Sequence, residues 1–288
     1  MKKLKRYQYE QYAILCHLAY PDDFDHTQYG FLPEGREEII DRWGRPIIRI
    51  LWGESNEVVL VFKGSQNIWD WLLNLACFPK KVITTHQSYY VHWGYHYLIH
   101  QKSSHRNYAF HQSHPDLSEN QKVDVFQASQ LPYYRQHAVN SNIIKQIQHI
   151  VEPLIASGKH ISLTGHSSGG AMAVLSADYL YQHFPQAIKR VVTFGQPATG
   201  FWSFKKHYPL NHQTYRICCD LDIVTFLPAI PFMHWHVGQM LWLHNGKIYQ
   251  NIPTIIRLSR SIISWIMRPF SYHFMQKYIR NKDFFDKH

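Results

Sequence analysis

The sequence predicts an α/β fold, in which parallel strands of a central sheet are joined by crossover helices. Apolar runs with strand character alternate with segments of helical periodicity, which is the pattern typical of such folds. One apolar run, HISLTG, passes directly into HSSGG and then into a helical pattern within residues 160–180. The chain has 288 residues, of which 45% are hydrophobic, and this is enough for one large domain with a sizeable core.

The first half of the chain predicts one helix and one pair of strands. Residues 9–20 have helical apolar spacing, and residues 45–65 have the pattern of two strands joined by a turn at 53–56. The stretch 101–140 is polar and lacks clear periodicity. We expect it to be an insertion on one edge of a single domain that covers residues 1–288.

The second half predicts a regular alternation of helices and strands. Residues 141–159 carry a helical apolar stripe that Gly158 can end, and Pro153 is expected to kink this helix or break its last turn. A helix is predicted at GAMAVLSADYLYQHF, and the predicted strands are ISLTG, KRVVTFG and TYRICCDLDIVTFL.

The charge balance favours an anionic partner. Lys and Arg exceed Asp and Glu by 30 to 20, which gives a formal charge of +10 and suits nucleic acid, an anionic membrane surface or an acidic protein. We do not expect a nucleic-acid partner, because the basic residues are dispersed and no zinc finger, RNP-type or helix-turn-helix pattern is present. The cysteines match no zinc or haem spacing and are expected to be reduced and structural: Cys16, Cys77, Cys218 and Cys219.

The basic N-terminus continues into polar and aromatic residues, where a signal peptide would need an apolar region. No apolar run reaches the roughly 18–20 residues that a membrane span needs. We therefore expect a cytoplasmic protein that can be peripheral at a membrane, or alternatively an effector exported without a conventional signal peptide.

The segment 252–270 approximates an apolar helical stripe that contains a tryptophan and is interrupted or flanked by arginines, among them Arg257. A basic amphipathic helix of this kind can lie in a membrane interface with its cations against anionic head groups, or it can pack on the core as an ordinary helix. Its place before the late histidines makes it a candidate lid, as is the polar stretch 101–140.

The five residues Gly165–Gly169 fit the G-x-S-x-G pattern, in which a serine sits on a strained turn between a strand and a helix. The two glycines permit the tight turn, and the backbone N–H of Ser168 points to where an oxyanion would form. Ser167 is the candidate nucleophile, and it needs a base and a group that orients the base. The alternative is a glycine-rich turn with no chemistry.

The expected chain order is serine, acid, histidine. Asp178, Asp220 and Asp222 follow the serine, and Asp222 comes after a predicted strand, at the carboxyl end of the sheet where an orienting acid belongs. Asp220 would share its face, so spacing alone prefers neither. Composition does not choose among the candidate bases, which are His234, His236, His244 and His273.

Three histidines recur every four residues, at His92, His96 and His100. On a helix they would share one face and could bind a metal, but a polar face in a histidine-rich protein is the simpler interpretation. We therefore expect no metal and no cofactor.

Seven segments together resemble the class 3 lipases, the fungal-type triacylglycerol lipase family of α/β hydrolases. The resemblance spans roughly residues 45–278 and is weakest in 101–140. The segments are VVLVFKGSQNIWDWLLNL, VHWGY, LTGHSSGGAMA, VVTFGQPATG, DIVTFLP, WHVGQMLWL and SYHFMQKYI.

The resemblance implies an α/β-hydrolase fold, with a mostly parallel sheet, helices on both faces and a lid-like insertion. It implies that Ser167 is the nucleophile, His273 the general base and Asp222 the acid. The backbone N–H groups of Ser65 and Ser168 would form the oxyanion hole. The expected activity is that of a serine lipase or phospholipase that hydrolyses lipid esters through an acyl-enzyme intermediate. The expected partners are a lipid ester substrate and an anionic membrane surface; the resemblance sets no oligomeric state.

The chain departs from the family pattern at Lys63, where arginine is usual, at Thr225, where proline is common, and at Tyr272, where an acid often precedes the histidine. None of these changes removes a catalytic atom, although they weaken any inference about family-typical substrates. Two alternatives stay open: a non-catalytic membrane- or partner-binding protein on a hydrolase scaffold, and a lipid acyltransferase or small-ester carboxylesterase.

Overall fold

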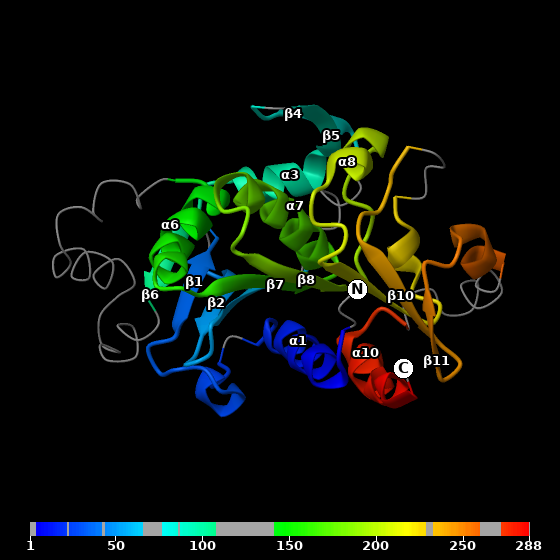
Figure 1. The fold of residues 1–288 in the computed structure, drawn as a ribbon, viewed down its shortest axis with the longest axis horizontal. Helices are drawn as coiled ribbons and strands as arrows, with labels where there is room; N and C mark the ends of the chain where they lie inside the picture. Colours follow the sequence, from blue (N-terminus) through cyan, green and yellow to red (C-terminus); the bar gives the residue numbers. More distant parts are fainter. Residues whose placement is uncertain are drawn as a thin grey trace, which may run out of the picture.

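A nine-stranded mixed sheet forms the centre of the molecule, with helices on both of its faces (Figure 1). The computed structural model describes residues 4–21, 23–41, 44–65, 77–85, 87–107, 141–228, 233–259 and 272–287. The strands of this sheet, in their order across it, are β11 (Lys247–Gln250), β10 (Gln239–His244), β9 (Thr214–Cys219), β8 (Ile188–Phe194), β7 (His160–His166), β3 (Glu57–Phe62), β2 (Pro46–Trp52), β1 (Arg36–Ile40) and β6 (Ser104–Asn107).

The middle of the sheet is parallel, since β3, β7, β8, β9 and β10 run in one direction. The antiparallel pairs lie toward the edges, between β2 and β3, β1 and β2, β1 and β6, and β10 and β11. The register sets Phe62 beside Gly165 and Gly165 beside Thr193. The carboxyl ends of β3, β7 and β8 therefore share one edge of the sheet. The predicted α/β fold is confirmed, with the parallel strands at the centre of a mixed sheet.

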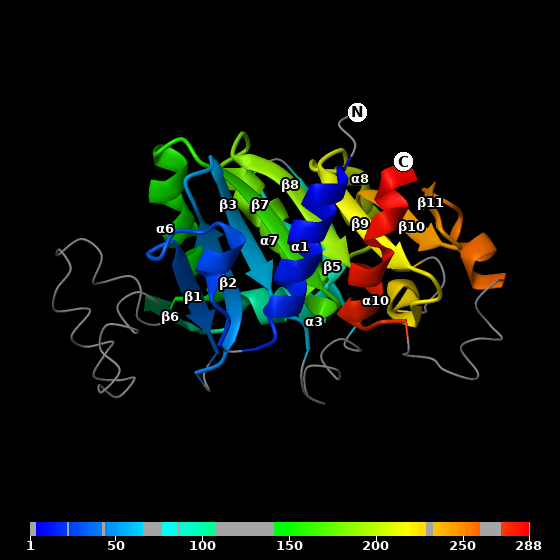
Figure 2. The same ribbon diagram turned by 90° about the horizontal axis from the view of Figure 1, so that it is seen from below.

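The helices form a layer on each face of this sheet. One layer holds α3 (Trp93–His100), α6 (Ile143–Ala156) and α7 (Ser168–His183), and the opposite layer holds α1 (Arg6–Leu18) and α10 (Met275–Arg280), as Figure 1 shows. Figure 2 shows α1 and α10 side by side across the sheet. The remaining elements are α8 (Trp202–His207), the two-stranded sheet of β4 (Pro79–Ile83) and β5 (Ser88–His92), and the 3₁₀ helices η1 (His26–Tyr29), η2 (Ile223–Phe226) and η3 (Asn281–Lys287).

Alternation along β3 produces the two apolar cores. Val58, Leu60 and Phe62 pack in the cluster with α3, α6 and α7, whereas Val59 and Val61 pack in the cluster with α1 and α10. Successive side chains of a strand point to opposite faces, so a strand that is apolar throughout is covered on both sides. The two cores cover both faces of the sheet and so fix the position of the edge formed by the carboxyl ends of β3, β7 and β8, where the candidate site lies.

The prediction for the helix around Pro153 was partly wrong, because α6 continues through this residue to Ala156 and its last turn is not broken. The proline removes one N–H donor, but the turn after it is still closed, because the N–H of Ser157 donates to the carbonyl of Pro153 at 3.0 Å. Gly158 closes the helix as predicted, with φ +91° and an N–H that donates to the carbonyl of Ile155 at 2.9 Å. The final predicted strand is shorter than expected: β9 ends at Cys219.

Two further expectations concern edge segments. The predicted insertion at 101–140 begins with an ordered part, because Ser104–Asn107 form β6 and pair with β1; the rest, 108–140, lies outside the described residues. Residues 254–259 are helical, whereas 260–270 also lie outside. In the described ranges, no helix has the length and apolar character to cross a membrane. All four cysteines are free thiols, as expected.

Candidate active site

The strand-to-helix turn at Ser167 has the geometry that the G-x-S-x-G pattern demands. Ser167 adopts φ 58° and ψ −131° between β7 and α7, a conformation that is costly for a residue with a side chain. Its N–H donates to the carbonyl of Phe194 at 2.9 Å, which holds the turn against β8. A Cβ at Gly165 would lie 2.4 Å from the backbone of Gly169, so glycine is required for the helix to approach the strand this closely.

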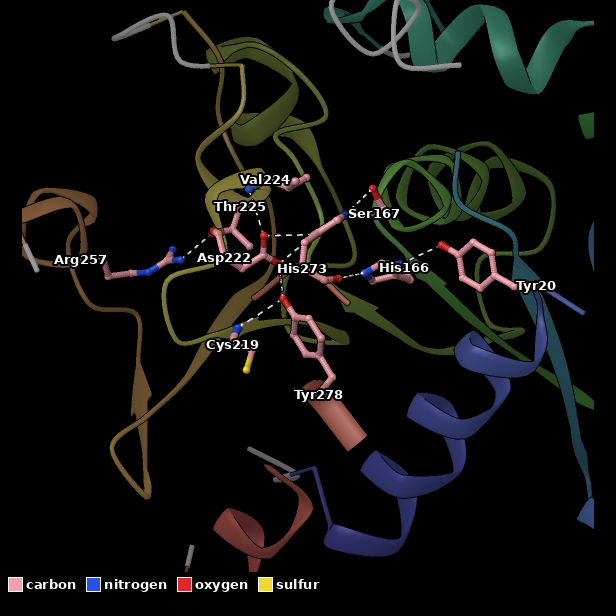
Figure 3. Close-up of polar contacts among 10 residues, drawn as sticks. All are labelled: Tyr20, His166, Ser167, Cys219, Asp222, Val224, Thr225, Arg257, His273 and Tyr278. Carbon is pink, nitrogen blue, oxygen red and sulfur yellow. Dashed lines mark hydrogen bonds and ion pairs between the residues drawn. The ribbon is translucent and has the colours of Figure 1, made fainter. Parts of the chain in front are cut away.

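The structure brings Ser167, His273 and Asp222 into one hydrogen-bonded chain (Figure 3). The Oγ of Ser167 lies 2.9 Å from His273 Nε2, and His273 Nδ1 lies 3.0 Å from both carboxylate oxygens of Asp222. Asp222 is fully buried and the His273 side chain is only 11% exposed. An imidazole held between a hydroxyl and a buried carboxylate is the arrangement that activates a serine.

Asp222 is fixed by two further donors. It precedes η2, where its Oδ1 accepts the N–H of Val224 at 3.0 Å, and its Oδ2 accepts the hydroxyl of Tyr278 at 2.5 Å. Burial, and then the charge of Asp222, raise the pKa of Tyr278 well above its ordinary value, so the phenol stays a donor. Sequence reasoning did not identify Tyr278, although it lies in the segment SYHFMQKYI that carries His273.

A second contact fixes the backbone of the histidine. His166 Nε2 lies 2.7 Å from the carbonyl oxygen of His273, and its Nδ1 lies 2.8 Å from the hydroxyl of Tyr20, near the end of α1 (Figure 3). Burial, and then the proximity of His273, lower the pKa of His166 well below its usual value. A neutral ring that donates from Nε2 and accepts at Nδ1 satisfies both contacts. Nothing in the sequence pattern indicated the role of Tyr20.

Ser65 and Ser168 also meet, although they are far apart in the sequence. The N–H of Ser65 donates to Ser168 Oγ at 2.9 Å, and the two hydroxyl oxygens lie 2.7 Å apart. The chain approaches closely here because Gly64 lacks a side chain: a Cβ at that position would lie 2.7 Å from the carbonyl oxygen of His166. The loop after β3 is thereby set beside the start of α7.

The other acids that the sequence offered lie elsewhere. Asp220 Oδ1 lies 3.2 Å from His244 Nδ1, and Asp178 accepts the hydroxyl of Tyr89. Spacing left open whether Asp220 or Asp222 is the acid. In the structure Asp222 contacts His273, whereas Asp220 contacts His244.

The other candidate histidines have structural contacts instead. His234 Nε2 lies 3.0 Å from the carbonyl oxygen of Cys77, and His236 Nε2 lies 3.0 Å from that of Thr225. Burial, followed by the nearby arginines, lowers the pKa of His236 well below its usual value.

Arg257 does not face a head-group surface, and this corrects the expectation for that one residue of 252–270. Ile255 and Ile256, its neighbours in the chain, are exposed. The Arg257 side chain is 2% exposed and lies over the rings of Phe226 and Trp242, at 4.4 and 5.7 Å. Its Nη2 donates to Thr225 Oγ1 at 2.6 Å, and that hydroxyl donates to the carbonyl of Asp222 at 2.7 Å. Cation–π packing and hydrogen bonds therefore turn the arginine inward, beneath the turn that carries the acid.

The histidines spaced by four residues do not share one helix face. His92 has an extended backbone and precedes α3, whereas the rings of His96 and His100 stack at 4.0 Å. Burial, followed by His100, lowers the pKa of His96 to about 4. Across the described ranges, no group of three or more His, Cys, Asp or Glu side chains is arranged to hold a metal ion.

Comparison with known proteins identifies the family of the chain. The family described as lipase (class 3) matches residues 59–232. A lipase from Rhizomucor miehei is 33% identical over 91 residues, a match that covers 30% of this chain and 25% of that relative's length. The match thus spans about a quarter of that protein.

Solved lipase structures share the fold. A triacylglycerol lipase whose catalytic centre is described as a serine-protease triad superposes with a TM-score of 0.52 at 21% identity, over 83% of this chain and 80% of that one. A lipase from Rhizopus microsporus var. chinensis gives a TM-score of 0.54 at 18% identity, over 83% and 74% of the two chains. The α/β-hydrolase fold is confirmed, and the chain belongs to the class 3 lipases, a family of carboxylic ester hydrolases.

Proposed function

We propose that this protein hydrolyses carboxylic esters of lipids, as a lipase or phospholipase, through an acyl-enzyme formed on Ser167. The observation that carries the proposal is the unbroken contact from Ser167 Oγ through His273 to the carboxylate of Asp222. Membership of the class 3 lipases supports the ester chemistry. The triacylglycerol lipase with the similar fold supports a lipid ester as the substrate.

In the first half of the reaction, Ser167 Oγ attacks the ester carbonyl while His273 Nε2 takes the hydroxyl proton. Asp222 accepts a hydrogen bond from Nδ1–H, which keeps the correct tautomer and stabilises the imidazolium. His273 then gives the proton to the leaving alcohol oxygen as the carbon–oxygen bond breaks. In the second half, His273 takes a proton from water, the hydroxide attacks the acyl carbon, and the fatty acid leaves as Ser167 regains its proton.

We propose that the backbone N–H groups of Ser65 and Ser168 bind the oxyanion of both tetrahedral intermediates. The N–H of Ser168 is at the positive end of α7, which favours negative charge. The N–H of Ser65 donates to the Ser168 hydroxyl in the structure. An oxyanion is a stronger acceptor than a neutral hydroxyl, so the substrate replaces that hydroxyl during the reaction.

The proposal is tested by hydrolysis of three substrates: a soluble short-chain ester, an emulsified triacylglycerol and a phospholipid vesicle. We expect Ser167→Ala to lower kcat at least about 10⁴-fold on every substrate that the wild type hydrolyses. The most rapidly hydrolysed long-chain substrate identifies the lipid class. Unchanged turnover by Ser167→Ala would refute the proposal.

A matched control lies on the same helix. The hydroxyl of Ser176 is buried and has no hydrogen-bond partner among the described residues, so Ser176→Ala should leave both activity and thermal unfolding close to wild type. Equal circular dichroism spectra of the two alanine variants show that a loss in Ser167→Ala is chemical.

A further inference from the structure

We infer that the outer face of the β4–β5 hairpin, together with α8, is a docking surface for lipid that carries anionic head groups. The inference rests on the proposed function, because an enzyme for lipid esters must meet its substrate at a lipid–water interface. The docking surface consists of Lys81, Ile83, Tyr90, Trp202 and Lys206.

The hairpin buries one face and exposes the other. Val82 and Tyr89 are opposite each other and are buried, and the ring of Tyr89 lies 5.4 Å from that of Phe204. Lys81 and Tyr90 are also opposite each other, but on the exposed face. Ile83 follows on the same face beside the turn, with 76% of its surface exposed. A lysine, an isoleucine and a tyrosine are therefore presented together, with no covering element among the described residues.

The start of α8 extends this face. The N–H of Tyr90 donates to Ser203 Oγ at 2.9 Å, and the N–H of Phe201 donates to the carbonyl of Tyr90 at 3.0 Å. Trp202 lies between Phe201 and Ser203 in the chain, and 57% of its surface is exposed. Figure 1 shows α8 beside β5, on the same side of the molecule. These two contacts therefore hold the start of α8, and with it Trp202, against β5.

The charge of this surface is of one sign. The segments that build it, 77–107 and 196–219, contain no Asp or Glu. Lys81 and Lys206 are exposed and form no ion pair within the described ranges. Elsewhere on the molecule basic side chains do pair with acids, as in Lys189–Glu57, Arg6–Asp283 and Lys282–Glu10.

Exposed lysines alone would fit any polyanion, but the apolar residues between them select a lipid surface. An exposed isoleucine and an exposed tryptophan are stabilised when they enter an apolar phase, and tryptophan and tyrosine prefer the boundary between head groups and acyl chains. Lysines beside them gain from anionic head groups.

The docking surface is close in the chain to the candidate active site. A Cβ at Gly195 would lie 2.7 Å from Asp222 Oδ2 and 3.1 Å from His273 Cε1. Gly200, five residues later, forms a backbone bridge with Val91 of β5. The segment 195–200 thus contacts Asp222 and His273 at one end and β5 of the hairpin at the other.

The test is co-sedimentation with vesicles of phosphatidylcholine, with and without phosphatidylglycerol, using Ser167→Ala so that no lipid is consumed. We expect binding to the phosphatidylglycerol vesicles that weakens with salt. The double variant Lys81→Glu/Lys206→Glu should reduce the partition coefficient about a hundredfold, and Ile83→Asp about tenfold. The matched controls Lys145→Glu on α6 and Tyr7→Asp on α1 change exposed residues away from this surface and should bind like their parent.

Four results would overturn the inference: equal binding to both vesicles, binding to neither, wild-type binding by the double variant, or preferred binding to duplex DNA or polyglutamate in competition with the vesicles. Hydrolysis of the soluble short-chain ester, measured in the same substitutions with Ser167 present, should be unchanged. Loss of vesicle binding with retained ester hydrolysis supports the inference, whereas vesicle binding by a wild type that hydrolyses no ester refutes only the proposed function.

Discussion

Two aspartates that are two residues apart each face a histidine, and only one of these pairs reaches a serine. Asp222 contacts His273, which contacts Ser167 Oγ. Asp220 contacts His244, at a single distance of 3.2 Å. Asp222 is fully buried, whereas the Asp220 side chain is 28% exposed. The two pairs have the same chemical groups in different environments.

The difference teaches that the surroundings, and not the pairing, make an Asp–His pair suitable for catalysis. Asp222 accepts hydrogen bonds from a backbone N–H, from a phenol and from one imidazole nitrogen that lies 3.0 Å from both of its carboxylate oxygens. These contacts fix the orientation of the carboxylate. In the other pair the His244 ring stacks on Trp242, with centroids 4.4 Å apart, and faces no serine hydroxyl among the described residues. A partly exposed pair of this kind is screened by water and contributes little.

The largest expected effect separates these two pairs. Asp222→Asn should lower kcat/KM on a soluble ester by roughly 10³–10⁴-fold, because the imidazole loses its tautomer and its charge partner. Asp220→Asn should stay within about threefold of wild type, since the contact is peripheral. The measurement is steady-state hydrolysis with both variants at equal folded concentration. A larger loss in Asp220→Asn would reverse the assignment of the acid.

A third aspartate extends the comparison to stability. Burial raises the pKa of Asp178 to about 6, against a smaller opposing effect of the Tyr89 hydroxyl. The folded state therefore holds its proton more tightly than the unfolded state, and stability falls as pH rises from about 4 to about 6. We expect Asp178→Asn to remove roughly 2–3 kcal/mol of this decline in the free energy of unfolding. Urea titrations at the two ends of the window measure it, and an identical pH slope in both proteins would contradict the burial argument.

The phenol on Asp222 gives a smaller effect on activity. Tyr278→Phe removes the hydrogen bond to Asp222 Oδ2 and the acceptor for the N–H of Cys219. We expect about a tenfold loss in kcat with KM unchanged, and about 1–2 kcal/mol of stability. Tyr249→Phe is the matched control and should change neither, because the ring of Tyr249 contacts Trp242 and not the triad. Unaltered kcat in Tyr278→Phe would show that the imidazole and the N–H of Val224 position the acid without the phenol.

The smallest effect concerns the oxyanion donors. Ser65→Ala and Ser168→Ala each keep the backbone N–H and remove a hydroxyl from the pair at 2.7 Å. If backbone groups bind the oxyanion, each variant should retain activity within about fivefold, whereas loss of a true donor costs roughly 10²–10³-fold. A loss of that larger size in Ser65→Ala would assign the donor to the hydroxyl.

The fold was largely predictable because its signals are local. The parallel strands, the turn between β2 and β3 and the helix after Ser167 follow from apolar runs and glycine positions. Two edge elements escaped prediction. The strand β6 has only four residues and pairs with β1, which is distant in sequence. The hairpin of β4 and β5 is local, but its strands have only five residues each. The effect of Pro153 on the last turn was misjudged, because a proline removes its own N–H donor but keeps a carbonyl that accepts the N–H of Ser157.

Only those residues of the candidate site that lie in recognisable sequence motifs were predicted. Ser167 follows from its turn, and the choice of Asp222 and His273 came from resemblance to a family, not from spacing. Tyr278, Tyr20 and Arg257 were not identified, because each reaches the site from another element and the burial of a side chain cannot be read from its own neighbours. Arg257 in particular has the sequence context of a surface cation and the contacts of a buried one.

The most direct test of the account is the reaction of the wild type with a fluorophosphonate, followed by mass spectrometry of the intact protein and its peptides. We predict one phosphonyl adduct, located on Ser167, no adduct in Ser167→Ala, and a much slower reaction in His273→Ala. An adduct on a different serine, or equal labelling of wild type and Ser167→Ala, would contradict the claim that these three side chains form one reactive unit.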